Sequence, residues 1–184
     1  MNAGVPKGKL YMEPYRPEWA AVGQETVETL RRVMKKAIDI RHVGSTAVVG
    51  MFSKPLIDIA VGVSNLDDVL EYVDELKELG IDYAGEVVPG QREFSIDDPE
   101  TGNRLVHIHV VIWNGEQWCD YVTLVDFLNE DERAREAYIL LKKSLLLRYE
   151  DRPGLYGPAK HKFMEDLRTD AHEWSEKRNE KLSD

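Results

Sequence analysis

The chain of 184 residues has the length of one folded domain, since single cores usually hold about 100–200 residues. Apolar residues make up 42% and charged residues 32%, which excludes a chain that is disordered throughout. The formal charge of −10 excludes broad nucleic-acid binding, because such binding neutralises many phosphates with Lys and Arg, although a local cluster of cations can still hold a small phosphate ligand.

The first half of the chain predicts a helix followed by two strands that enclose a loop. Apolar residues at helical spacing predict a helix over residues 18–36. Residues 38–43 then form a strand, and the apolar β-branched run over residues 56–63 predicts a buried strand. Ser64 or Asn65 begins the next helix, and Gly80 ends it.

The second half predicts a hairpin followed by helices. Residues 92–96 and 105–113 have the composition of strands, and the turn-forming segment 97–103 between them predicts an antiparallel hairpin. Helical spacing of apolar residues returns from about residue 130 and again over residues 163–174. From Ser175 the sequence is polar, and we expect it to fray. These elements predict a mixed α/β domain over residues 1–175 with a polar tail at 176–184.

The cysteine content and the lack of long apolar runs predict a cytoplasmic protein. Cys119 is the lone cysteine, so no disulfide forms within the chain, and we expect a packed thiol rather than a nucleophile. No stretch approaches the roughly 20 apolar residues of a membrane span, and the first residues have no apolar signal segment. We therefore expect no membrane contact.

The loop after the first strand and the strand that follows it contain the first candidate site. Gly44, Ser45 and Thr46 predict a loop whose backbone and hydroxyl groups approach an anion, since glycine has no Cβ in the way. On the following strand Asp58 shares one face with Ala60, and a buried carboxylate needs a partner or a metal ion. A structural Asp58 that accepts hydrogen bonds from Ser45 or Thr46 is the alternative.

Histidines supply the second candidate site. His107 and His109 alternate with apolar residues, so both imidazoles face one side of their strand. This pattern fits a metal pair, an acid/base pair or a phosphate contact, and equally two polar residues on a half-solvated face. A metal would need a third ligand, for which Asp58 or Glu93 could serve. We expect His42 to be a packing or hydrogen-bonding residue.

Cations near the end of the chain are the third candidate. Arg152, Tyr156 and Lys160 are four residues apart, so they share one face if the segment is helical. Lys160 could contact a phosphate, and Lys54 is held at a rigid turn by Pro55. A solvated basic patch is the alternative.

One string of residues resembles the pattern of the GrpB-like (UPF0157) family. It comprises Gly44-Ser45-Thr46-Ala47-Val48, Lys54-Pro55 and Ile57-Asp58-Ile59, with weaker matches at His107-Ile108-His109, Tyr138 with Leu141-Lys142, and Tyr156 with Lys160. That family is grouped with the nucleotidyltransferases. The resemblance implies an α+β fold, in which a nucleotidyltransferase-like mixed β-sheet is flanked by helices and followed by C-terminal helices. It also implies binding of a nucleoside triphosphate with Mg²⁺ or another divalent metal, and nucleotidyl transfer to an unknown acceptor.

The resemblance also implies roles for individual residues. Three residues are expected to be catalytic, namely Asp58, His107 and His109. The implied metal ligands are Asp58, His109 and Glu93. The implied phosphate-binding residues are Gly44, Ser45, Thr46, Lys54, Tyr156 and Lys160.

Departures from the family pattern keep a second function open. The superfamily places a second carboxylate two residues after the first, where this chain has Ala60, and one carboxylate does not make a two-metal site. Val125 and Asn129 stand where the family tends to show Arg. The alternative is a non-catalytic module that binds a phosphorylated small molecule or a protein partner, since relatives are joined to a coenzyme A biosynthetic kinase. Glu86 or Glu93 within reach of Asp58 would favour catalysis. Phosphate-ester hydrolysis at a His/Asp metal centre is a third possibility.

Overall fold

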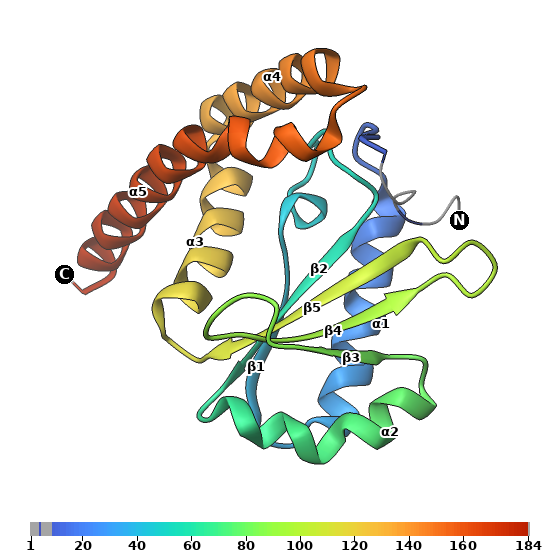
Figure 1. Ribbon diagram of the computed structural model, residues 1–184. Coiled ribbons are helices and arrows are strands. Elements are labelled where there is room, and N and C mark those ends of the chain that lie inside the picture. Colours follow the sequence, from blue (N-terminus) through green and yellow to red (C-terminus); the bar gives the residue numbers. More distant parts are fainter. Residues whose placement is uncertain (1–3, 5–8, 184) are drawn as a thin grey trace.

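The chain folds into a five-stranded sheet with helices on both faces, as the computed structural model of residues 4 and 9–183 shows (Figure 1). This confirms the predicted mixed architecture. The elements in chain order are α1 Pro17–Val33, β1 Ala37–Val43, the 3₁₀ turn η1 Ser45–Ala47, β2 Ile57–Val63, η2 Leu66–Tyr72, α2 Val73–Glu78, β3 Asp82–Gly85, β4 Arg92–Asp97, β5 Arg104–Ile112, α3 Glu116–Glu130, α4 Glu132–Tyr149, η3 Pro153–Leu155 and α5 Tyr156–Ser183.

The sheet is mixed, with the strand order β1-β2-β5-β4-β3. β2 and β5 are parallel, and the other neighbouring pairs are antiparallel. The predicted hairpin is confirmed, since β4 and β5 are joined by a turn in which the Asp98 amide donates to the Asn103 carbonyl at 2.8 Å. Strand β3 was not predicted, because a four-residue edge strand depends on its partner for stability.

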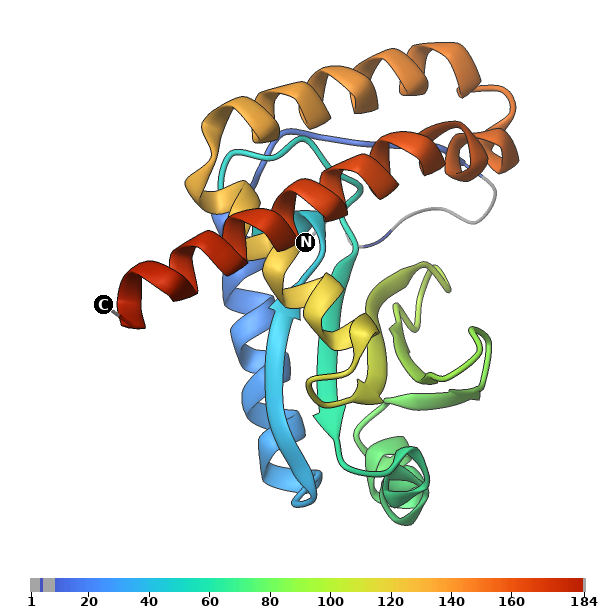
Figure 2. The same ribbon diagram turned by 90° about the vertical axis from the view of Figure 1, so that its left-hand side faces the viewer.

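Two apolar cores lie on opposite faces of the sheet. Helix α1 covers one face, where Leu30 packs with Ile59 and Ile108. Helices α3, α4 and α5 contribute to the other core, which includes Ala60 of β2 and Val111 of β5. Figure 2 shows α4 and α5 side by side across the end of the sheet, with α3 beneath them. Asp58 and Ala60 share one face of β2, as predicted, and the structure shows that this is the face with the C-terminal helices.

The C-terminal half differs from the sequence analysis in two places. Helix α3 was not expected, because its β-branched and aromatic residues are weak helix formers, and packing against the sheet and α5 overrides that preference. The segment from Ser175 was expected to fray, but α5 continues to Ser183. Arg178 forms an ion pair with Glu130 of α3 and lies 5.1 Å from the ring centroid of Trp174, so contacts with α3 hold this turn.

Two further findings concern the helices and the cysteine. None of the helices in the described part of the chain is long and apolar enough to cross a membrane. Cys119 is half-buried and packs against the core formed with the C-terminal helices.

Candidate phosphate and metal site

The loop between β1 and β2 contacts the carboxylate of Asp58. Gly44 has a φ of 69°, a backbone conformation that favours glycine. A Cβ at this position would lie 2.4 Å from Oδ2 of Asp58, so only glycine allows the loop to approach so closely. Among the described hydrogen bonds, none joins Asp58 to Ser45 or Thr46. The purely structural alternative for Asp58 therefore has no hydrogen bonds to support it.

Thr46 anchors the loop to neighbouring residues. Its side chain is buried, and its Oγ1 donates to the Leu56 carbonyl at 3.1 Å. Nε2 of His42 lies 3.0 Å from Oγ1 of Thr46. Burial lowers the pKa of His42 to about 4, so this imidazole is neutral. The predicted structural role of His42 is confirmed. The Thr46 hydroxyl is thus engaged within the protein, and its phosphate contact stays a prediction.

The two histidines of β5 lie beside Asp58 of β2. The register pairs Asp58 with His107 and Ala60 with His109, which brings the three polar side chains onto one face. Their candidate ligand atoms all lie within 4.8 Å of one another. The centroids of the two imidazole rings are 4.1 Å apart. The pKa of His107 is lowered, mainly by burial and to a smaller extent by the neighbouring His109.

Glu93 supports this cluster from β4 and stands outside the three-residue group. Its Oε2 lies 2.7 Å from Nε2 of His107, and the side chain is buried. Glu86, the other acid considered as a replacement for the missing carboxylate, forms an ion pair with Arg92. Neither glutamate therefore fills the place of the second acid.

Three lysines from separate parts of the chain surround Asp58 on its other side. Lys54, Lys142 and Lys160 line one cavity of about 220 Å³ together with Asp58 and Ser45. Lys142 is buried on α4 and donates to Ser45 Oγ at 2.6 Å. Burial, and then the charge of Lys160, lowers the pKa of Lys142 to about 7. Burial also lowers the pKa of Lys54 and Lys160.

Tyrosine rings contact these lysines. The Nζ atoms of Lys54 and Lys160 lie 5.1 and 5.5 Å from the centroid of the Tyr156 ring. Lys142 Nζ lies 4.3 Å from the centroid of Tyr138. Burial raises the pKa of Tyr138 to about 12, so both its ring and its hydroxyl remain neutral beside the cations.

A larger cavity of about 470 Å³ adjoins the lysine cavity. The two share Ser45, Asp58, Tyr138 and Lys160. Apolar side chains form much of its wall, and its polar groups come mainly from α3, α5 and the end of the β3–β4 connection. They are Gln91, Gln117, Asp120, Tyr121 and Arg168. The site thus has a cationic compartment and a mixed apolar compartment that meet at Asp58.

The sequence prediction did not single out Lys142 as a site residue, although one signal was present. Tyr138, Leu141 and Leu145 mark the buried face of α4, and position 142 lies on that face. A lysine at a buried helical position is rare unless it is paired.

Asn129 was noted only as a departure from the family. Its side chain accepts a hydrogen bond from the Val49 amide at 3.0 Å and donates one to the Ala47 carbonyl at 3.2 Å, so it stabilises the loop.

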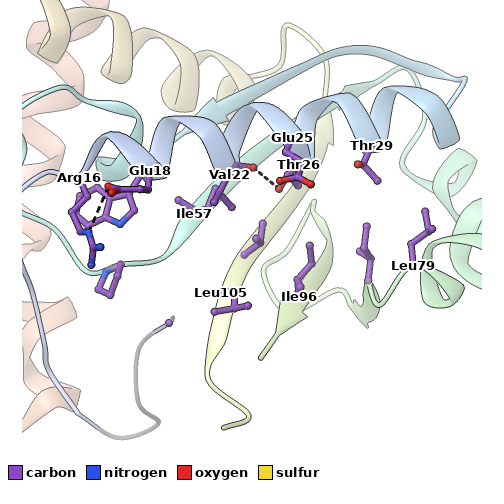
Figure 3. A pocket seen from close by; sticks show the side chains of 15 residues that line it. Arg16, Glu18, Val22, Glu25, Thr26, Thr29, Ile57, Leu79, Ile96 and Leu105 are labelled. Carbon is purple, nitrogen blue, oxygen red and sulfur yellow. Dashed lines mark hydrogen bonds and ion pairs between the residues drawn. The ribbon is translucent and has the colours of Figure 1, made fainter. Parts of the chain in front are cut away.

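A separate cavity of about 310 Å³ lies on the opposite face of the sheet, beneath α1 (Figure 3). The labelled side chains of Val22, Ile57 and Leu105 make it largely apolar. Arg16 and Glu18 form an ion pair of 3.7 Å at one end. Within the described part of the chain, the candidate metal-ligating group lies at Asp58 and not in this cavity.

Comparison with known proteins identifies the family of this chain. The family model described as GrpB protein matches residues 9–170. The glutamate-rich protein GrpB of Alkalihalophilus pseudofirmus is 30% identical over 168 residues, which cover 89% of this chain and 97% of that protein. The crystal structure of the conserved protein GrpB from Enterococcus faecalis aligns with a TM-score of 0.78 at 26% identity, over 88% of this chain and 96% of that one.

More distant structures share only the fold. The Cid1 poly(U) polymerase, in its form with Mg and 3'-dATP, aligns with a TM-score of 0.55 at 16% identity. The match covers 79% of this chain and 49% of the polymerase, so this chain spans about half of that enzyme. The fold is therefore nucleotidyltransferase-like, and the chain belongs to the GrpB protein family.

Proposed function

We propose that this protein binds a nucleoside triphosphate together with a divalent cation and transfers the nucleotidyl group to an acceptor. The observation that carries the proposal is the convergence of Lys54, Lys142 and Lys160 on the cavity beside Asp58. Buried cations repel one another and need a counterion. Within the cavity that the three lysines share, the one acidic side chain is Asp58, so the lysines favour an additional anion such as a polyphosphate.

The proposed reaction uses the two compartments differently. The lysines and the Ser45 hydroxyl hold the phosphates, and the larger cavity has room for the base or the acceptor. An acceptor oxygen bonds to the α-phosphorus, the bond to the bridging oxygen breaks, and pyrophosphate leaves. The acceptor's proton passes to solvent, since His107 and His109 are committed to the cation described next, and Lys160, which lines both cavities, stabilises the developing negative charge.

A divalent cation fits the residues present, because the ligand atoms of Asp58, His107 and His109 come within 4.8 Å of one another. Held there, such an ion would neutralise phosphate charge. Glu93 would orient His107, with which it interacts at 2.7 Å, rather than contact the ion.

Ala60 favours a second candidate function. Its side chain is fully buried at the position where the superfamily has its second acid. One carboxylate does not provide the oxygen ligands of a two-metal site. The second candidate is therefore a binding module that holds a phosphorylated small molecule without turnover, in the cytoplasm and beside a protein partner.

Isothermal titration of the protein with each of the four ribonucleoside triphosphates, with and without Mg²⁺ or Mn²⁺, tests the proposal. We expect binding that needs the cation and weakens at least about tenfold in Asp58→Asn, because the carboxylate would then lack its charge. Asp82→Asn, at an exposed position of β3, is the matched control and should bind normally. Release of pyrophosphate in the presence of candidate acceptors would establish transfer.

The three outcomes have different meanings. Binding with pyrophosphate release supports nucleotidyl transfer. Binding that requires Asp58 but gives no release with any acceptor favours the binding module. Failure of all four triphosphates to bind would rule out the nucleotide assignment.

A further inference from the structure

We propose that Asp58, His107 and His109 form a mononuclear site for a divalent transition metal ion of the Zn²⁺ and Co²⁺ type, in preference to Mg²⁺. This inference deepens the proposed function at the same site, but its test needs no nucleotide. The argument starts from the donor atoms. Two imidazoles and one carboxylate give a nitrogen-rich set, which suits transition metals, whereas Mg²⁺ prefers oxygen ligands in octahedral geometry.

The sheet register explains how a histidine comes to occupy this place. β2 and β5 are parallel, and Ala60 is directly paired with His109. A second carboxylate two residues after Asp58 would have projected from position 60 onto this face. The neighbouring strand supplies an imidazole there instead. The chain therefore replaces an oxygen ligand on one strand with a nitrogen ligand on the next.

The distance between His109 and Asp58 fits two ligands of one ion better than a direct bond. Nε2 of His109 lies 3.6 Å from Oδ1 of Asp58, which is too long for a hydrogen bond. Two donors about 2.1 Å from one tetrahedral ion lie about 3.4 Å apart. Both side chains are largely buried, with exposed fractions of 11% and 26%, so water does not fully solvate either group.

Hydrogen bonds on the far side of each ring select the nitrogen that would bind the ion. Nδ1 of His109 lies 3.2 Å from the Gln91 amide oxygen, which can only accept, so Nδ1 carries the hydrogen and Nε2 faces Asp58. Nε2 of His107 likewise donates to Glu93 at 2.7 Å, which leaves Nδ1 free to bind. Such outer partners are characteristic of metal-ligating histidines.

Glu93 adds an independent observation. Its Oε1 is buried and has no hydrogen-bond partner among the described residues. A buried carboxylate with one unsatisfied oxygen is costly unless positive charge lies near it. A metal ion bound to His107 would supply that charge through the imidazole. The site would keep open positions, since the chain provides three ligands, and phosphate oxygens could occupy them.

The test is titration of the metal-free protein, prepared with a chelator, with Zn²⁺, Co²⁺ and Mg²⁺ in separate experiments. We expect one equivalent of Zn²⁺ or Co²⁺ to bind at least about 100-fold more tightly than Mg²⁺. The visible absorption of bound Co²⁺ reports its coordination number and geometry, and the variants show which side chains are ligands. Asp58→Ala and His109→Ala should lose the Co²⁺ spectrum. Glu93→Gln, which keeps the shape of the side chain, should weaken binding about 10- to 100-fold.

Controls distinguish this site from metal bound at surface histidines. His161 lies on α5, its side chain is 71% exposed, and His161→Ala should leave the affinity and the spectrum unchanged. Circular dichroism confirms that each variant is folded. Equal affinity for Mg²⁺ and Zn²⁺, or a Co²⁺ spectrum that survives His109→Ala, would overturn the proposal. Tight Zn²⁺ binding without any triphosphate binding would support this site and reject the nucleotide function.

Discussion

Lys142 is the residue whose chemistry the fold changes most. It lies buried on α4, donates to Ser45 Oγ and to the Phe52 carbonyl, and contacts the face of Tyr138. Burial lowers its pKa to about 7, so near neutral pH its charge depends on its surroundings. A phosphate bound nearby would stabilise the charged form and raise that pKa.

This shift predicts proton uptake on ligand binding. Above pH 7 the free protein loses the Lys142 proton, and binding of an anion restores it. We therefore expect triphosphate affinity to fall by up to about tenfold per unit as the pH rises from 7 towards 9. Calorimetry in buffers of different ionisation enthalpy should show uptake of up to one proton. Lys142→Met should bind more weakly and lose the pH dependence, and an unchanged profile in this variant would show that another group is responsible.

At the scale of elements, the packing of α1 on β1 helps to position the loop of Gly44, Ser45 and Thr46. A Cβ at Gly23 of α1 would lie 2.3 Å from Nδ1 of His42 on β1. The imidazole is itself fixed by Thr46 in the loop. The contact between helix and strand is therefore connected through His42 to the loop beside Asp58.

We predict that Gly23→Ala lowers the free energy of unfolding by about 1–3 kcal/mol, as overpacking does. Alanine is intrinsically better than glycine in a helix by about 1 kcal/mol, but here the clash outweighs that gain. Urea denaturation measures the change. Gly157→Ala is the matched control, because a Cβ there meets nothing within 4 Å, and it should leave stability equal or slightly higher. If both variants were stabilised, α1 would not be seated against His42.

At the scale of the whole molecule, a cationic site lies within an acidic protein. The chain has a formal charge of −10, while three lysines are gathered in one cavity. A small anion can enter that cavity, whereas a long phosphate backbone would also meet the acidic surface. The fold shared with a poly(U) polymerase does not by itself predict RNA binding, because the chain spans about half of that enzyme.

We therefore predict no binding to single-stranded oligo(U) or to duplex DNA at about 0.15 M salt, near physiological ionic strength. Fluorescence anisotropy of labelled oligonucleotides measures this directly. A triphosphate titrated under the same conditions serves as the positive comparison. Micromolar binding of oligo(U) would contradict the prediction and indicate a cationic surface path from the lysine cavity.

Local patterns predicted several parts of this molecule correctly. Period-two alternation directed Asp58 and Ala60 to one face and His107 with His109 to one face, because side chains on a strand alternate whatever its neighbours are. Turn-forming residues predicted the β4–β5 hairpin. Gly44 was identified as a position where the lack of a Cβ allows close approach. These features depend on residues close together in the chain.

The tertiary structure alone decided which of these faces meet. Sequence periodicity does not state that β2 pairs with β5, so the juxtaposition of Ala60 and His109 followed only from the register. Tertiary packing also brought Lys142 beside Ser45, 97 positions earlier in the chain. It placed the Leu56 carbonyl where it accepts a hydrogen bond from the Thr46 hydroxyl. The physical reason is that long-range packing chooses among many locally equivalent arrangements by the total burial and hydrogen bonding they allow. The sequence by itself therefore determined the candidate donors, and the packing of the sheet and C-terminal helices determined which donors share a site.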